Sequence, residues 1–185
     1  MSKASQIIVL CEDKAHEMFV MRFLKKGLGV RNRMIRPIPY PCGEGSAKRH
    51  VEDKIEGQVN AIRNRQSRAS TILIVVRDAD EESVDQVRKR LEQKIIPPRC
   101  EKEPIALIIP KWHIETWFAY LAGETVDESG QKTYKNKYGK ISESKQSHSY
   151  IDQLAETCRK NESLTSPPNS LLKSCAEFNR VQDML

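Results

Sequence analysis

Two short apolar runs, each followed by acidic residues, constrain the fold of this chain more than any other feature. The first run spans residues 7–11 and leads into Glu12; the second spans 71–76 and is followed by Asp78 and Asp80. Both are short, β-branched and without polar alternation, which predicts strands buried on both faces. Such strands belong to parallel sheets covered by helices, where ligands bind beyond the carboxyl ends of the strands. We therefore expect these three carboxylates to meet at one edge of a sheet.

Strands and helices are predicted to alternate up to residue 121. Helical spacing favours helices over 14–26, 47–66, 81–94 and around 114–121, and further strands are expected over 34–40 and 105–109. Pro37 and Pro39 favour an edge position for the strand over 34–40. The pattern predicts an α/β fold with an open, mostly parallel sheet flanked by helices.

The last third of the chain has weaker periodicity. Residues 122–149 are rich in polar residues and glycine, which predicts a long loop or irregular arm, with Tyr134 and Tyr138 suited to a partner. Helices are expected over 151–159 and 171–184. We divide the chain into a core, 1–121, and a section, 122–185, in which this arm and a small carboxyl-terminal helical appendage pack on the same domain.

Positive charge is concentrated in one segment. Residues 22–68 hold twelve Lys or Arg against four acids, an excess of +8, whereas the whole chain carries +6. This asymmetry favours a phosphate-bearing partner, although a solvated basic face would have the same composition.

Other classes of site have little support in the sequence. Five cysteines without a C-x-x-C pair predict reduced structural thiols, and the four histidines show no metal-ligand spacing. No apolar stretch approaches the ~20 residues that span a bilayer, and the first residues lack a signal peptide's apolar region. We expect a cytoplasmic protein with no membrane partner.

The acidic residues predict a site for a hard cation. Glu12, Asp78 and Asp80 offer the oxygen ligands that Mg²⁺ or Mn²⁺ prefers. Asp80 could instead cap the helix expected from residue 81. Glu115 could be a further metal ligand or pair with Lys111, four residues before it.

Several basic residues are candidate phosphate contacts. Lys48 and Arg49 follow a glycine-rich loop over 41–46 that could offer backbone amides to a phosphate, although it lacks the ending of a Walker A motif. With them we group Lys14, Arg63 and Lys111 as candidate nucleic-acid contacts. A plain surface turn explains the loop equally well.

The segments IIVLCEDK and ILIVVRDAD together resemble the Toprim domain of topoisomerases, bacterial primases and the nucleases of the OLD (overcoming lysogenization defect) family. In that pattern a strand ends in Glu, often followed by Gly, and a later strand ends in Asp-x-Asp; here Asp13 replaces the Gly. The segments IIPKWHIETWFAYL and SPPNSLLKSCAEFNR are similar to those of small single-domain Toprim-like proteins of bacterial defence loci.

The resemblance implies a Mg²⁺-dependent or Mn²⁺-dependent nuclease. Glu12, Asp78 and Asp80 would be its catalytic residues and metal ligands, with Glu12 as general acid/base or ligand, and Glu115 a further ligand. Nucleic acid, DNA more than RNA, would be the substrate, and an ABC-type ATPase would control cleavage in anti-phage defence. Two alternatives stay open: a catalytically inactive binding or sensor subunit, and an RNA-processing enzyme similar to ribonuclease M5.

Overall fold

The sheet that carries the predicted acidic residues is entirely parallel. A computed structural model describes residues 3–41, 46–65, 69–130, 134–160 and 162–185. In these ranges four strands pair in the order β2-β1-β3-β4; they are β1 (Gln6–Cys11), β2 (Ile35–Pro37), β3 (Thr71–Val76) and β4 (Ile105–Ile108). The predicted α/β class, the parallel sheet and the edge position of the strand with Pro37 are confirmed.

The register brings the carboxyl ends of the three longer strands side by side. Cys11 at the end of β1 pairs with Val76 at the end of β3, and Val76 pairs with Ile108 at the end of β4. Residues that follow these three positions must therefore leave the sheet at the same edge, as predicted for Glu12 and Asp78.

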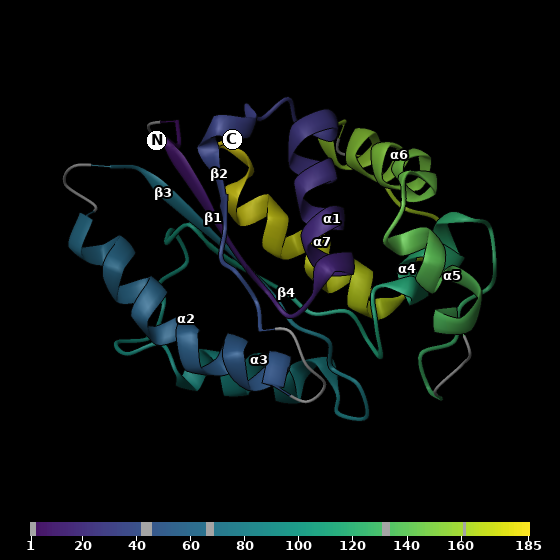
Figure 1. Cartoon of the computed structure of the whole chain (residues 1–185), viewed down its shortest axis with the longest axis horizontal. Coiled ribbons are helices and arrows are strands. Elements are labelled where there is room, and N and C mark those ends of the chain that lie inside the picture. Colours follow the sequence, from purple (N-terminus) through teal and green to yellow (C-terminus); the bar gives the residue numbers. More distant parts are fainter. Residues whose placement is uncertain (1–2, 42–45, 66–68, 131–133, 161) are drawn as a thin grey trace.

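Alternate side chains of each strand enter two separate hydrophobic cores. Ile7 and Val9 of β1 face one core, while Ile8 and Leu10 face the other. Figure 1 shows α2 (Ser46–Arg65) and α3 (Val84–Gln93) on one side of the sheet and α1 (Lys14–Arg22) on the other, with α4 (Glu115–Leu121) beyond it. Burial on both faces explains why the strand sequences lack alternation.

Two helix starts are set by side-chain caps near the acidic residues. Asp13 caps α1 by accepting a hydrogen bond from the His16 amide, and α1 continues into a π-helical turn, η1 (Phe23–Gly27). A 3-10 turn, η2 (Asn32–Met34), precedes β2. Ser83 and Gln86 form a capping box at the start of α3, which begins at Val84 and not at residue 81. Asp80 therefore does not cap this helix.

The prediction of a long loop or irregular arm over 122–149 is wrong for the second half of that segment. Residues 134–142 form α5 (Tyr134–Ser142), and a 3-10 turn, η3 (Lys145–Ser147), leads into α6 (His148–Arg159). Tyr134 and Tyr138 are buried in the same core as α1 and α4. These two tyrosines stabilise the fold and do not form an exposed docking surface.

The last helix, α7 (Asn169–Gln182), packs along β4 at the open edge of the sheet (Figure 1). Glu177 Oε2 accepts a hydrogen bond from the Leu107 amide at 2.9 Å, and Ser174 Oγ accepts one from the Ile109 amide at 3.3 Å. Arg99 Nη1 donates to the Ile105 carbonyl at 2.9 Å. β4 is the last strand on its side of the sheet, and these side chains satisfy backbone groups in and just after β4 that no further strand could pair with.

Within the described part of the chain, no helix combines the length and the apolar composition needed to cross a lipid bilayer.

Candidate metal centre

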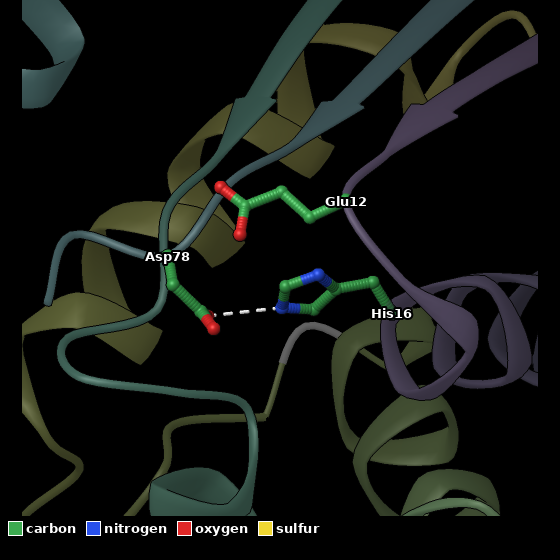
Figure 2. A group of neighbouring side chains, drawn as sticks. All are labelled: Glu12, His16 and Asp78. Atoms are coloured by element: carbon green, nitrogen blue, oxygen red, sulfur yellow. Dashed lines mark hydrogen bonds and ion pairs between the residues drawn. The ribbon is translucent and has the colours of Figure 1, made fainter. Parts of the chain in front are cut away.

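Glu12, His16 and Asp78 converge at the carboxyl edge of the sheet. Each offers one ligand atom, and these atoms all lie within 4.8 Å of one another. Figure 2 shows Glu12 just after β1, His16 on the first turns of α1, and Asp78 on the segment that follows β3. All three side chains are buried. This group could hold a metal ion.

The start of α1 explains how His16 reaches the two carboxylates. Because Asp13 caps the helix, His16, which lies four residues after Glu12, is in the first turn of α1. A side chain there leans toward the amino end of the helix, which faces the ends of β1 and β3. His16 is fully buried, and its Nδ1 lies 3.4 Å from Asp13 Oδ1.

His16 and Asp78 form a direct contact, whereas Glu12 is left with an unpaired oxygen. His16 Nε2 lies 2.9 Å from Asp78 Oδ1, the contact drawn as a dashed line in Figure 2. Glu12 Oε1 lies 3.9 Å from Arg77 Nε, which is too long for a hydrogen bond. Among the described residues neither of these two atoms has a hydrogen-bond partner. A buried carboxylate oxygen without a donor is costly unless a proton or a cation binds there.

Electrostatics at the site reflect an excess of negative charge. Burial, with the nearby charge of Asp78, raises the pKa of Glu12 to about 8. Burial also raises the pKa of Asp78, although His16 offsets part of that rise. Burial alone would lower the pKa of His16, but the charge and hydrogen bond of Asp78 raise it to about 10. A cation between the carboxylates would relieve the repulsion that these shifts report.

Arg77 supports the site through the backbone of Asp78. Its guanidinium is buried, Nη1 donates to the Asp78 carbonyl at 2.8 Å, and Nη2 lies 2.9 Å from Glu52 of α2. Arg77 therefore fixes the backbone of Asp78 while its charge is largely taken up by Glu52.

Asp80 lies near the group but its side chain pairs with Lys48 of α2. Its backbone has a φ of 52°, a conformation that non-glycine residues rarely adopt. Lys111 Nζ donates to the carbonyls of Asp80 and Glu82, and so holds this turn in place. A surface depression of about 330 Å³ lies here, lined by Lys48, Arg77, Ala79, Asp80, Glu81, Glu82 and Trp112. Asp80 would have to release Lys48 to become a ligand.

Glu115 is buried but has other partners. Its Oε1 accepts a hydrogen bond from Ser142 Oγ of α5 at 2.7 Å, and its Oε2 lies 3.5 Å from His113 Nδ1. It does not belong to the group formed by Glu12, His16 and Asp78. Lys111 does not pair with it, because the Lys111 ammonium binds the turn after β3.

The remaining candidate phosphate contacts are spread over the molecule. Lys14 lies 3.2 Å from Glu143 and is more than half exposed, and Arg49 is exposed on α2. Arg63 forms two hydrogen bonds to Glu103, at 2.7 and 3.0 Å, so its charge is locally neutralised. The glycine-rich loop predicted as a phosphate contact has residues 42–45 outside the described ranges.

Sequence reasoning missed His16 and Arg77. The spacing of the histidines among themselves gives no sign of a metal site, because the partners of His16 are carboxylates that follow two strands. The available signal was that His16 lies in the first turn of the predicted helix, only four residues after Glu12 and so next to the same edge of the sheet. Arg77, inside the acidic motif itself, was the second signal.

Comparisons with protein-family models, with curated proteins and with solved structures found no match for this chain. The site's geometry therefore stands on its own as the basis for a function.

Proposed function

We propose that this protein is a divalent-metal-dependent phosphodiesterase that cleaves nucleic acid. The observation that carries the proposal is the buried group of Glu12, His16 and Asp78 at the carboxyl edge of a parallel sheet. Oxygen ligands from two neighbouring strands suit Mg²⁺ or Mn²⁺. The Toprim relationship inferred from the sequence motifs is part of this proposal.

The residues divide into metal ligands and a positioning residue. Glu12, whose buried Oε1 has no hydrogen-bond partner in the described structure, and Asp78 would hold the cation. His16 Nε2, 2.9 Å from Asp78 Oδ1, would orient that carboxylate. When bound, the metal would polarise a phosphoryl oxygen and favour a nucleophilic water.

The charge distribution supports a nucleic-acid substrate. The segment 22–68 has an excess of +8, and within it Lys48 of α2 pairs with Asp80 beside the acidic edge. The Lys48–Asp80 pair joins the basic helix to the acidic turn, where an incoming phosphate would compete with Asp80 for the ammonium. We infer DNA before RNA, and control by an ABC-type ATPase in anti-phage defence, from the sequence resemblance.

The test combines metal binding with cleavage. Purified protein would be incubated with plasmid DNA, single-stranded DNA and total RNA, each with Mg²⁺, Mn²⁺ or EDTA. We expect cleavage with Mn²⁺ or Mg²⁺ that EDTA abolishes and that Glu12→Gln reduces at least about 100-fold. Glu17→Gln is the matched control, because Glu17 lies on α1, five residues after Glu12, and outside the group. Cleavage that persists in EDTA, or that Glu12→Gln leaves unchanged, would refute the proposal.

A second candidate is a binding module without catalysis. The specific observation in its favour is that Asp80 pairs with Lys48 and Glu115 accepts a bond from Ser142, so two of the predicted carboxylates are already engaged. Binding of DNA or RNA to the wild type in a gel-shift assay, without any product in Mn²⁺, would favour this candidate.

A further inference from the structure

Two thiols from different helices meet on the side of the molecule formed by α6 and α7. Cys158 lies near the end of α6 and Cys175 near the middle of α7, and their Sγ atoms are 3.9 Å apart. Both side chains are half-buried. They line a groove of about 450 Å³ together with Glu162, Leu164, Leu172 and other residues. The pair is therefore in reach of small solutes.

The separation is that of two unbonded thiols poised for a bond. A disulfide has an S–S length of ~2.05 Å, so the sulfurs must approach by roughly 1.9 Å. A change of side-chain torsion moves a sulfur by this order of distance without moving the helix. Leu172, more than half exposed beside the groove, leaves space for that change.

The two thiols differ in character. The hydrogen bond between them lowers the pKa of Cys158 and, with burial, raises the pKa of Cys175. The lowered pKa favours the thiolate, which is the nucleophile, at Cys158 over Cys175.

We propose that Cys158 and Cys175 form an oxidation site at which peroxide produces a disulfide that joins α6 to α7. The Cys158 thiolate attacks one peroxide oxygen, the O–O bond breaks, and one water leaves after protonation, with the sulfur as sulfenic acid. The Cys175 sulfur then attacks that sulfenic sulfur, the S–O bond breaks, and a second water leaves. Two thiols are oxidised by two electrons and one peroxide is reduced to two waters.

The disulfide would fix a helix that holds the sheet. Ser174, next to Cys175, bonds the Ile109 amide, and the Pro110 carbonyl accepts the Ala79 amide at 2.8 Å. A covalent link between α6 and α7 would join two cysteines 17 positions apart in the sequence and restrict the unfolded chain. The oxidised form should therefore melt several degrees higher than the reduced form.

The other described cysteines provide an internal comparison. Cys11 is fully buried in the core of the sheet, and Cys100 is exposed. Peroxide should therefore leave Cys11 reduced and oxidise Cys100.

The experiment is peptide mapping of the folded full-length protein after peroxide treatment. Trypsin places Cys158 in the peptide 146–159 and Cys175 in 174–180. We expect these two peptides to be recovered joined, 2 Da lighter than their sum, and released by reductant. Cys100→Ser should keep the joined product, and Cys158→Ser should lose both that product and the rise in melting temperature.

Two results would overturn the proposal. One is recovery of the peptides 146–159 and 174–180 as separate free thiols after Cys100 has been fully oxidised. The other is recovery of the two cysteines as separate sulfinic acids or in links between chains, which would show that the sulfurs do not meet in solution.

Discussion

Glu12 and Asp78 are carboxyl groups of the same buried group, yet their neighbours give them different roles in stability. Glu12 Oε1 has no donor within the described structure, whereas Asp78 is bonded to a fully buried histidine. Neutralising Glu12 relieves repulsion within the group, whereas neutralising Asp78 removes the partner of the buried His16 imidazolium. The two substitutions should therefore change the free energy of unfolding in opposite directions.

Glu12→Gln is expected to raise the free energy of unfolding in EDTA at neutral pH by about 1–3 kcal/mol. A carboxyl whose pKa is raised to about 8 by burial and by crowding with Asp78 must take up a proton on folding, whereas an amide need not. The same variant should lose the stabilisation that Mn²⁺ gives the wild type, about 2.7 kcal/mol at a hundredfold excess over Kd. Urea unfolding with and without Mn²⁺ measures both effects, and Glu17→Gln should change neither. A variant less stable than wild type in EDTA would contradict the crowding argument.

Asp78→Ala is expected to lower the free energy of unfolding by about 3 kcal/mol, since His16 would be left buried without its counter-charge. His16→Ala should recover much of this loss when the two changes are combined. A double-mutant cycle from urea unfolding gives the coupling energy directly. Additive losses would mean that the 2.9 Å contact contributes little.

At the scale of elements, the close packing of η1 against α6 depends on a single glycine. A Cβ built on Gly27 would lie 1.9 Å from the Ala155 Cβ, so no side chain fits there without movement of a helix. The same helix, α6, carries Ile151 and Leu154 into the core beside α1. Gly27 therefore sets how closely these two elements approach.

Gly27→Ala should lower the free energy of unfolding by about 1–3 kcal/mol through overpacking. Gly57→Ala is its matched control, because Gly57 is an exposed position inside α2 with nothing within 4 Å of an added Cβ. That change should stabilise the protein by about 0.5–1 kcal/mol through helix propensity. Thermal unfolding of both variants measures these changes. Equal changes in the free energy of unfolding would show that α6 moves away from Gly27 at no cost.

The sequence predicted those elements whose pattern follows from burial. The unbroken apolar runs over 7–11 and 71–76 became β1 and β3, because a strand buried on both faces needs apolar residues at every position. α5 was missed for the opposite reason. Its buried Tyr134 and Tyr138 are separated by lysines and asparagine, and a glycine follows, so the apolar stripe is short and interrupted.

The site was predicted only in part, because sequence patterns give the ends of strands but not the directions of side chains. Glu12 and Asp78 meet since their strands are neighbours in register. Asp80 leaves the edge because its left-handed backbone turns its side chain toward Lys48. His16 enters because α1 begins two residues after Glu12, with Asp13 as its cap, and that depends on tertiary arrangement.

At the scale of the whole molecule, Glu177 connects the last helix to the sheet through a network of charges. It is buried, accepts from the Leu107 amide, and pairs with Arg99 at 2.7 Å and with Arg88. Burial would raise the pKa of Glu177, but these donors lower it below the ordinary value of 4.5. A carboxylate with a lowered pKa stabilises the fold at neutral pH, and that contribution is lost as the pH falls through the lowered value.

The contribution of Glu177 to the free energy of unfolding is therefore expected to be constant above pH 4.5 and to decrease as the pH falls below 4.5. Glu177→Gln should lower stability at neutral pH by about 2–4 kcal/mol and flatten the acid dependence. Urea unfolding from neutral pH down to about pH 3 measures both. Glu162→Gln, at an exposed position, is the control; an unchanged acid slope in Glu177→Gln would assign that slope to other carboxylates.

The side chains that α7 places along β4 also determine whether the sheet can grow. A free strand edge is a template for another chain, and paired edges are the usual start of fibres. On the β4 side, Glu177 and Ser174 occupy the backbone donors that a new strand would need. On the β2 side, Pro37 has no donor to offer. The β4 edge is thereby closed to recruitment of a second molecule for as long as α7 stays in place, and the short β2 edge has one donor fewer to offer to another strand.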